Sequence, residues 1–250
     1  MRVIYAFKTL IKNYRKIMPI FLVVAITTTL LSNIIPLIGM VLLLPLKISV
    51  SFVMIVAIRR PNQLTFMPLY IGFRRKNYLK NVYYMTLKEV LFLLPAVIGA
   101  IISGLIYRFV EIDTKMTIII INLIIFSIPA AIISLMLAMV PFLLADSTFD
   151  QRKHNPLKHS AIILKGSYIK LISMRLFFVP WLLWFASGFL VTAVSFYNLS
   201  IQNVSALNPL SISWILTLPI KLLLIDPWYQ MTHAQLYVSL RQKAKNQKRV

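Results

Sequence analysis

Long apolar runs constrain this chain more than any other feature of its sequence. From Ile17 to Ile58, about forty residues carry a single charge, on Lys47. A helix needs about 20 apolar residues to cross the roughly 30 Å of hydrocarbon in a bilayer. The run is therefore too long for one span and long enough for two, and Asn33, Pro36 and Gly39 mark the turn between them.

Similar runs recur along the chain, and hydrophobic side chains make up 59% of it, against roughly 45–50% in a soluble domain. We therefore predict an all-α fold: one polytopic membrane helix bundle covering residues 1–250, with about six transmembrane helices and short cytoplasmic interfacial helices. The predicted spans are residues 17–36, 37–58, 90–107, 116–144, 171–197 and 209–237. An interfacial helix at 1–16 precedes them, and a basic tail at 238–250 follows.

The placement of charge predicts the orientation of the bundle. Lys and Arg residues in short loops are retained on the cytoplasmic side of a membrane. With both termini inside, 23 of the 27 basic residues lie in cytoplasmic segments. Two of the others, Arg108 and Lys115, are balanced by Glu111 and Asp113 in an outer loop. We therefore expect a multi-pass membrane protein with its N- and C-termini in the cytoplasm.

A short helix is predicted in the cytoplasmic segment after the fourth span. Asn155 is a suitable N-cap, and Pro156 suits the first helical position because its missing N–H would be unpaired there anyway. The helix should run through Leu164, and Gly166 can end it.

Composition and motifs exclude several classes of function. The net charge of +21 does not indicate nucleic acid, because a nucleic-acid binder carries its basic residues on the polar face of a soluble fold. Without Cys, thiol catalysis, disulfides and Cys-ligated metals are excluded. The residues His154, His159 and His233 form no H-E-x-x-H pattern, Glu89 and Glu111 are the only glutamates, and there is no Walker A loop. We expect no enzyme, no catalytic residue, no metal and no cofactor.

Charges within the spans are the first set of candidate functional residues. An ionisable group in hydrocarbon costs several kcal/mol unless it is paired, hydrated or able to snorkel. Lys47 lies in the second predicted span, and Lys221 and Asp226 lie in the sixth. Pro227 loosens the helix beside Asp226 by removing a backbone donor. Either Asp226 neutralises Lys221 or Lys47 and marks a polar cavity, or it is shallow enough to be hydrated while the lysines bond to backbone carbonyls.

Basic amphipathic segments form a second candidate set, in residues 1–16, 74–88 and 158–170. Each basic residue near an anionic leaflet can add about 1 kcal/mol of attraction. The candidates for contact with anionic headgroups are Lys8, Lys12, Arg15, Lys16, Arg74, Arg75, Lys76 and Lys165. Topology determination explains most of this charge, and recognition of a lipid headgroup or an acidic partner is the alternative.

Short motifs in the C-terminal half point to a family. They are Ala138–Ser147 (AMVPFLLADS), Ser160 with Leu164–Tyr168 (LKGSY), Phe177–Trp181, and Pro227-Trp228 with Ala234, Leu236 and Tyr237. Together with the N-terminal helix and the Arg59-Arg60 loop, they resemble the bacterial integral membrane family catalogued as domain of unknown function nine hundred seventy-five. The resemblance covers most of the chain. It implies a six-span inner-membrane protein from a Gram-positive bacterium, and it implies no established activity.

These features favour a non-enzymatic membrane protein of the bacterial envelope, in the plasma membrane, that is an accessory to export or to immunity against membrane-active peptides. Its expected partners are the anionic bilayer and another membrane protein or an ABC-type ATPase. The alternative is a small secondary transporter or transporter subunit, with a polar site where proline and charge interrupt spans two and six. An intramembrane enzyme is a third option, for which the sequence offers no recognisable acid–base pair.

Overall fold

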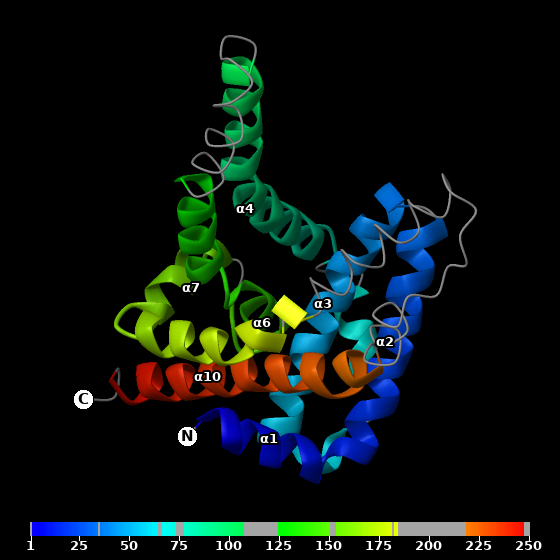
Figure 1. Cartoon of the computed structure of the whole chain (residues 1–250). Helices are drawn as coiled ribbons and strands as arrows, with labels where there is room; N and C mark the ends of the chain where they lie inside the picture. Colours follow the sequence, from blue (N-terminus) through cyan, green and yellow to red (C-terminus); the bar gives the residue numbers. More distant parts are fainter. Residues whose placement is uncertain are drawn as a thin grey trace.

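The computed structural model describes residues 2–34, 36–64, 67–73, 78–107, 125–150, 154–181, 183–184 and 219–247. Within them the chain is helical and has no strand, so the predicted all-α fold is confirmed (Figure 1). The elements are α1 (Arg2–Lys12), α2 (Tyr14–Ile34), α3 (Pro36–Arg59), the 3-10 helices η1 (Pro61–Gln63) and η2 (Met67–Phe73), α4 (Tyr78–Tyr107), α6 (Val140–Ala145), α7 (Pro156–Leu164), the π-helix η3 (Lys221–Ile225) and α10 (Asp226–Gln247). Residues 125–136 and 168–181 are also helical.

The first apolar run forms two helices that pack against each other. α2 ends at Ile34 and α3 begins at Pro36, so the chain reverses where the turn residues predicted it. Pro36 takes the first helical position, where its fixed φ is already suited to a helix. These two helices coincide with the predicted spans 17–36 and 37–58.

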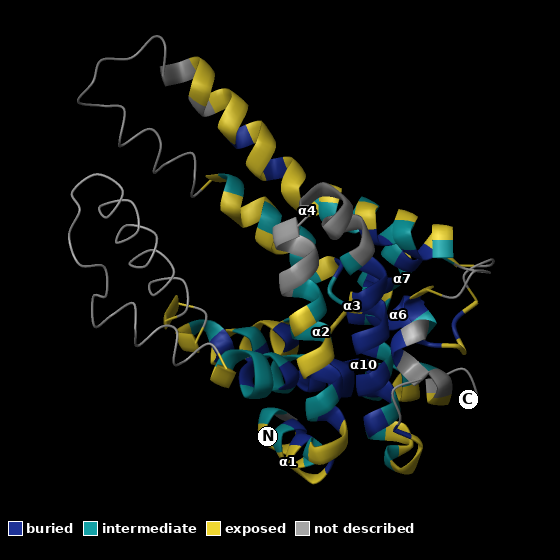
Figure 2. Ribbon diagram, turned by 90° about the vertical axis from the view of Figure 1, so that its right-hand side faces the viewer, coloured by how far each residue is buried: buried dark blue, intermediate teal, exposed yellow. Residues whose placement is uncertain are grey.

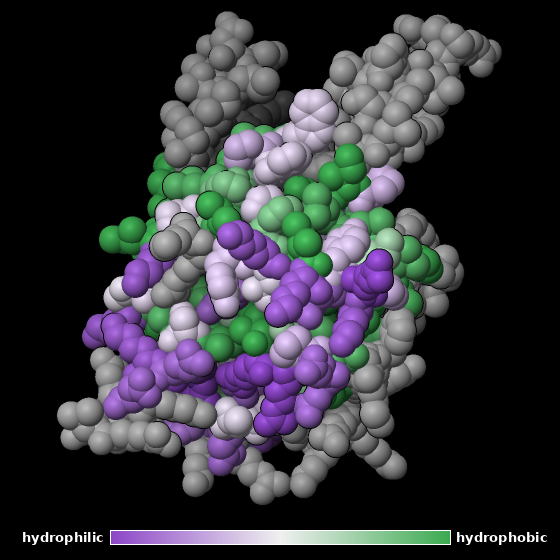
Figure 3. Space-filling view, turned by 90° about the horizontal axis from the view of Figure 1, so that it is seen from below, coloured by the Kyte–Doolittle hydropathy of each residue, from purple (hydrophilic) through white to green (hydrophobic). Residues whose placement is uncertain are grey.

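Three helices lie crosswise to the α2–α3 pair at one end of the molecule: α1, α10 and residues 168–181 (Figure 1). α1 packs along α10, and the Trp228 indole N–H donates to the Val3 carbonyl at 2.9 Å. Phe178 of the third helix lies edge-on to Trp228 and Tyr229, with ring centroids 5.2 and 5.3 Å away. Hydrophilic side chains gather on the side of the molecule that carries α1 and α10 (Figure 3). We call the end formed by α1, α7 and α10 the polar end.

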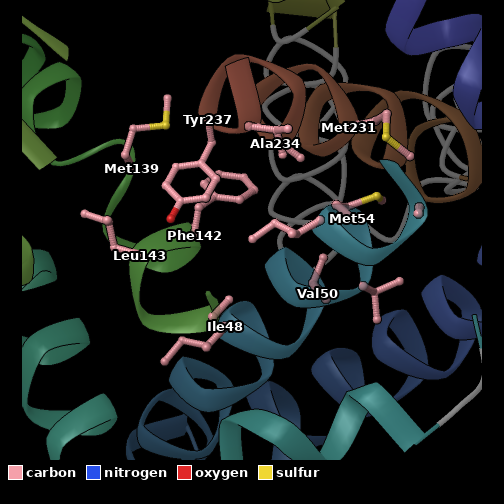
Figure 4. Close-up of a cluster of buried hydrophobic side chains, with 14 of the residues drawn as sticks. Ile48, Val50, Met54, Met139, Phe142, Leu143, Met231, Ala234 and Tyr237 are labelled. Carbon is pink, nitrogen blue, oxygen red and sulfur yellow. The ribbon is translucent and has the colours of Figure 1, made fainter. Parts of the chain in front are cut away.

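The hydrophobic core lies where α10 crosses α3 and α6. Residues 231–238 of α10 are all buried. Tyr237 stacks on Phe142 of α6 with ring centroids 5.8 Å apart, and Met54 of α3 lies in the same cluster (Figure 4). The core therefore ties elements from both halves of the chain together.

Two helical segments, Tyr78–Ile102 and Ile125–Ala145, are long and apolar enough to cross a membrane. Only 17% and 39% of their most apolar windows are buried, whereas the core helix of a soluble protein is mostly buried. Exposed residues follow α4 along its length (Figure 2). The count among the described residues is two, so it does not support the predicted six crossings, and parts of the last three predicted spans lie outside the described residues.

The helix of the fourth predicted span, 116–144, is interrupted, which the sequence did not lead us to expect. Residues 125–136 are helical, 137–139 form a turn, and α6 continues from Val140. Pro141 explains the break, because proline donates no backbone hydrogen bond and its ring clashes with the carbonyl four residues earlier. Ser160 of α7 satisfies the freed groups: its hydroxyl donates to the Met136 carbonyl at 2.6 Å and accepts the Met139 N–H at 3.2 Å.

The last predicted span, 209–237, also differs from the structure. α10 does not end at Tyr237 but runs to Gln247 within the polar end. Its buried polar side chains are bonded within the protein: Thr232 donates to the Trp228 carbonyl at 2.8 Å. The part of this span from Met231 onward is therefore covered by protein, because α1, α3 and α7 pack around α10.

The apolar stripe of α1 also packs on protein. Leu10 is fully buried in the core, and the Phe7 ring lies 4.7 Å from the Trp228 ring. A helix lying on headgroups would leave this stripe free to enter the acyl chains. Leu10 and Phe7 therefore belong to the contact with α10, whereas Ile4, Tyr5 and Ile11 of the same helix are exposed. The interpretation of residues 1–16 as an interfacial helix on anionic headgroups stays a prediction. Lys8 and Lys12 remain exposed on the outer face of the helix.

Candidate functional site

A cavity of about 460 Å³ lies between α2, α3, residues 168–181 and the junction of η3 with α10. We call it the η3 cavity. Its lining residues are mainly apolar: Phe21, Val24, Thr28, Leu43, Leu46, Lys47, Val50, Phe178, Trp181, Lys221, Ile225, Asp226, Tyr229 and Gln230. The structure thus brings Lys47, Lys221 and Asp226, the three candidate charges of the predicted spans, to one cavity.

The π-helical segment η3 places Lys221 and Asp226 on the cavity wall. The Asp226 N–H bonds to the carbonyl of Lys221, five residues earlier. Pro227 accounts for this wider turn, because it has no N–H and its ring displaces the carbonyl of the preceding turn. The Lys221 ammonium lies 2.8 Å from the Asp226 carboxylate, so Asp226 neutralises Lys221 and not Lys47. Single π turns within α-helices occur frequently at functional sites.

Lys47 is paired with a different acid. Its ammonium lies 2.9 Å from Oε1 of Glu89 in α4, and Lys88 contacts the same oxygen at 3.2 Å. From the sequence, Glu89 is considered only as one of two glutamates in a chain without an H-E-x-x-H pattern, and this pairing is not predicted. The available signal was an acid at the start of an apolar run, in a chain whose second span carries one unmatched lysine.

Each lysine on the cavity wall therefore has an acidic partner beside largely apolar walls. Volumes of about 300–1,000 Å³ are typical of cavities that bind small molecules. An anionic group on a ligand can replace Asp226 or Glu89 as the partner of a lysine, while an apolar body contacts Phe21 and Val24. The geometry thus suits an amphipathic ligand. In the described part of the chain, no group of three or more His, Cys, Asp or Glu residues could hold a metal ion.

A buried ion-pair cluster at the polar end was not predicted. The Asp146 carboxylate, 1% exposed, accepts two hydrogen bonds from the Arg59 guanidinium, at 3.3 and 3.2 Å, and one from the Tyr237 hydroxyl at 2.8 Å. Thr148 donates its N–H at 3.1 Å and its hydroxyl at 2.9 Å, and Nε of Arg241 lies 3.8 Å away. We call these five residues the Asp146 cluster.

The Asp146 cluster joins the C-terminal ends of α3 and α6 to α10. Burial by itself raises the pKa of the Asp146 carboxyl, but the hydrogen bonds from Arg59, Thr148 and Tyr237 outweigh burial and hold the pKa below its ordinary value. The sequence gives one sign of the Asp146 cluster: Arg59 and Asp146 each directly follow an apolar run. We interpret the cluster as a structural joint, because both Asp146 oxygens accept hydrogen bonds from residues of α3 and α10 and of the segment after α6.

The predicted headgroup contacts are exposed wherever the structure describes them: Lys8, Lys12, Arg15, Lys16 and Lys165. Lys16 also donates to the Pro61 carbonyl at 3.4 Å. The other three, Arg74, Arg75 and Lys76, lie outside the described residues. Their contact with a headgroup or an acidic partner stays a prediction.

The short helix after the fourth span is confirmed, together with its caps. The Asn155 side chain accepts the Leu157 N–H at 2.9 Å, and α7 runs from Pro156 to Leu164. Gly166 has a φ of 77°, in the region that favours glycine. The motif around this glycine therefore has a structural explanation in the turn that ends α7.

Comparison with curated proteins and with solved structures gave no match. A family model described as protein of unknown function (DUF975) matches residues 7–244. This range includes the Asp146 cluster, the charged residues of the η3 cavity and the motifs of the C-terminal half. The chain therefore belongs to the DUF975 family of proteins of unknown function.

Proposed function

We propose that this protein is a multi-pass protein of the bacterial plasma membrane, with both termini in the cytoplasm, and that its η3 cavity binds an amphipathic solute. In this proposal the chain is a small transporter or a transporter subunit with about six crossings. The observation that carries the proposal is the η3 cavity, in which a π-helical segment sets the Lys221–Asp226 pair beside apolar walls and near Lys47.

Exposed apolar side chains support the membrane placement. Beyond Glu89, α4 exposes Leu93, Val97, Ile101 and other large apolar residues. The helical residues 125–136, 168–181 and 183–184 expose a further set: Ile125, Ile128, Ile132, Leu176, Phe177, Trp181, Leu183 and Trp184. Soluble monomers rarely expose contiguous apolar patches larger than a few hundred Å². Lipid is the simplest cover for such surfaces.

A π-helical segment and a proline inside a helix support a role in transport. Secondary transporters commonly bind substrate where discontinuous helices meet near the middle of the membrane. η3 interrupts one wall of the cavity, and Pro45 lies in α3, on the other wall. At this proline the Ser49 hydroxyl donates to the Pro45 carbonyl at 3.1 Å and accepts the Gly72 N–H at 3.0 Å, so η2 is attached to α3 beside the cavity.

A role as an accessory to export or to immunity is the second candidate. The exposed basic residues of the polar end favour it, because an acidic surface on an ABC-type ATPase or on another membrane protein would complement them. In that role the η3 cavity need not open to water on both sides of the membrane. Access to the cavity therefore separates the two candidates.

The chain has no cysteine, so single-cysteine variants can measure that access directly. Val50→Cys places a thiol on the α3 wall of the cavity, and Met54→Cys places one in the core a turn later on the same helix. A membrane-impermeant cationic methanethiosulfonate is applied to right-side-out and to inverted vesicles. We expect Val50→Cys to react from both sides, because a transporter exposes its site alternately, and Met54→Cys to react from neither.

Each other outcome has a defined meaning. If Val50→Cys is as unreactive as Met54→Cys, the cavity is not a solute site and the proposal fails. Reaction from one side only contradicts transport and favours the accessory role. Ser147→Cys, in the exposed segment after α6, tests orientation: reaction from the outer face would overturn the predicted topology.

A further inference from the structure

A second hollow lies at the polar end, apart from the η3 cavity. It has a volume of about 610 Å³ and runs between α7, the turn that follows α7, and the last turns of α10. We call it the α7–α10 groove. Its charged and imidazole side chains are Asp150, His154, His159, Lys165, Arg241 and Lys243. Nothing in the proposed transport role uses these residues.

The groove carries an excess of positive charge. Lys165, Arg241 and Lys243 line it, against one acid, Asp150. Among the described residues, no ion pair joins Lys165 or Lys243 to a carboxylate, whereas Arg241 lies 3.8 Å from Asp146. Two cationic side chains thus face the groove without a neutralising partner from the described part of the fold.

The turn after α7 shapes one side of the groove. Lys165 has φ −54° and ψ 124°, Gly166 has φ 77°, and the Ser167 N–H bonds to the Leu164 carbonyl at 2.8 Å, which is the geometry of a type II turn. No atom lies within 4 Å of the position that a Gly166 Cβ would take. The turn therefore presents open backbone, a hydroxyl-bearing residue and Lys165 to the same hollow.

Two histidines and an aromatic ring also line the groove. The rings of His154 and His159 are 5.4 Å apart, and Phe149 lies 6.2 Å from the first and 5.1 Å from the second, between ring centroids. Both imidazoles also border a smaller hollow that Lys158 lines. Packing of the three rings holds the imidazole nitrogens, which can donate hydrogen bonds, at the edge of the basic groove.

We propose that the α7–α10 groove binds a phosphate group, either as a lipid headgroup or as a free phosphate. A phosphate monoester carries a charge of about −1.5 to −2 and three acceptor oxygens at neutral pH. These match several further donors and two lysines that form no ion pair with any described carboxylate. A carboxylate offers half that charge and two oxygens. The inference rests on the groove alone and holds whether or not the η3 cavity transports a solute.

The test measures phosphate binding by the full-length protein in a neutral detergent. The probes are inorganic phosphate, dihexanoyl phosphatidic acid, which carries a phosphate monoester on a lipid, and dihexanoyl phosphatidylcholine, which has no net charge. We expect binding of inorganic phosphate, of phosphatidic acid or of both, and none of phosphatidylcholine. In the double variant Lys165→Gln with Lys243→Gln, the affinity should fall about tenfold, because two charge-assisted contacts are lost.

The double variant Lys8→Gln with Lys12→Gln is the matched control. It removes the same charge from exposed positions on α1, and its affinity should stay within about twofold of the original, because surface charges at a distance are screened. Tighter binding of phosphatidic acid identifies a lipid source, and tighter binding of inorganic phosphate identifies a soluble one. Absence of binding to both, or an equal loss in the two double variants, overturns the proposal. The single variants Lys165→Gln and Lys243→Gln serve if the double variant does not fold.

Discussion

Asp146→Asn is expected to loosen the polar end, because Asp146 is the acceptor at the centre of the Asp146 cluster. Asparagine keeps the shape of the side chain but replaces one carboxylate oxygen by an NH₂ group, which cannot accept. If the amide oxygen faces Thr148, the NH₂ group faces the second Arg59 donor and the Tyr237 hydroxyl. The charge of Arg59 is then left without its counterion.

The magnitude follows from the exposure of the two partners. Removing one member of a buried ion pair destabilises a protein by about 3–5 kcal/mol. Asp146 is 1% exposed, but Arg59 is 34% exposed, so water stabilises part of the orphaned guanidinium. We therefore expect a loss of about 3 kcal/mol in the free energy of unfolding. Tyr237→Phe removes one hydrogen bond and keeps the ion pair, so its expected cost is about 1.5 kcal/mol.

The effect of Asp146→Asn on stability should depend on pH. The pKa of Asp146 is depressed in the folded state, so its stabilisation is complete above the ordinary value of about 3.9 and is lost as the pH falls through the folded-state value. Asparagine has no such titration. The difference in stability between the original protein and Asp146→Asn should therefore shrink as the pH falls below about 4.

The assay is reversible unfolding in mixed detergent micelles, followed by helical circular dichroism, at neutral and acidic pH. Tyr5→Phe, which removes a hydroxyl from an exposed tyrosine of α1, is the control and should change stability by less than about 0.5 kcal/mol. A cost below about 1 kcal/mol for Asp146→Asn would refute the assignment of the Asp146 cluster as a structural joint. So would an acid-dependent loss that is unchanged in the variant.

Three further predictions concern other joints. Gly72→Ala should lower the free energy of unfolding by about 2 kcal/mol in the same assay, because its Cβ would overlap the Pro45 carbonyl. Its control is Gly104→Ala, where no atom lies within 4 Å of the new Cβ, and this change should be neutral or stabilising. Ser160→Ala should lower the free energy of unfolding by about 2 kcal/mol, since it leaves one buried and one partly buried backbone group unbonded at the break before α6. Trp228→Phe should speed hydrogen exchange of α1 about tenfold, because it removes the hydrogen bond from Trp228 to Val3 and leaves only that from Gln235 to Thr9 between the described residues of α1 and α10. Unchanged exchange would contradict a role of Trp228 in attaching α1.

Local chemistry made some features of this fold predictable. The reversal between α2 and α3 depends on Pro36 and its neighbours, and the start of α7 depends on the Asn155 side chain bonding two residues on. The looseness of the helix before Pro227 follows from one missing N–H, and the structure shows it as η3. Each of these features is decided within about one helical turn, so it can be recognised without knowing where other helices lie.

The crosswise packing of α1 and α10 was not predictable on those grounds. An amphipathic stripe has the same spacing whether its apolar face meets lipid or another helix, and Leu10 gives no sign of which. Similarly, residues 226–237 follow an apolar run and were joined to it by hydropathy alone. The structure covers residues 231–237 with α1, α3 and α7, and that choice depends on contacts between segments that are distant in the sequence.

The two ion pairs of the η3 cavity also differ in whether they depend on local sequence or on contacts between distant segments. Lys221 and Asp226 are five residues apart, so one of the two pairings considered for Asp226 could be judged from helical spacing. Lys47 and Glu89 are 42 residues apart, and their meeting depends on which helices are neighbours. Hydropathy does not encode the order of helices around a bundle.

The family motifs and the charged residues of the η3 cavity lie largely in different parts of the molecule. Asp146, Ser160, Gly166 and Trp228 stand in the motifs that carry the resemblance, and each is engaged in a cap, a turn or a joint of the polar end. The residues that charge the η3 cavity, with Asp226 among them, lie outside those motifs. We therefore expect the motifs to specify how the polar end is assembled and the cavity charges to determine which solute is bound. The double variant Lys221→Asp with Asp226→Lys should then alter ligand preference while leaving the polar end folded.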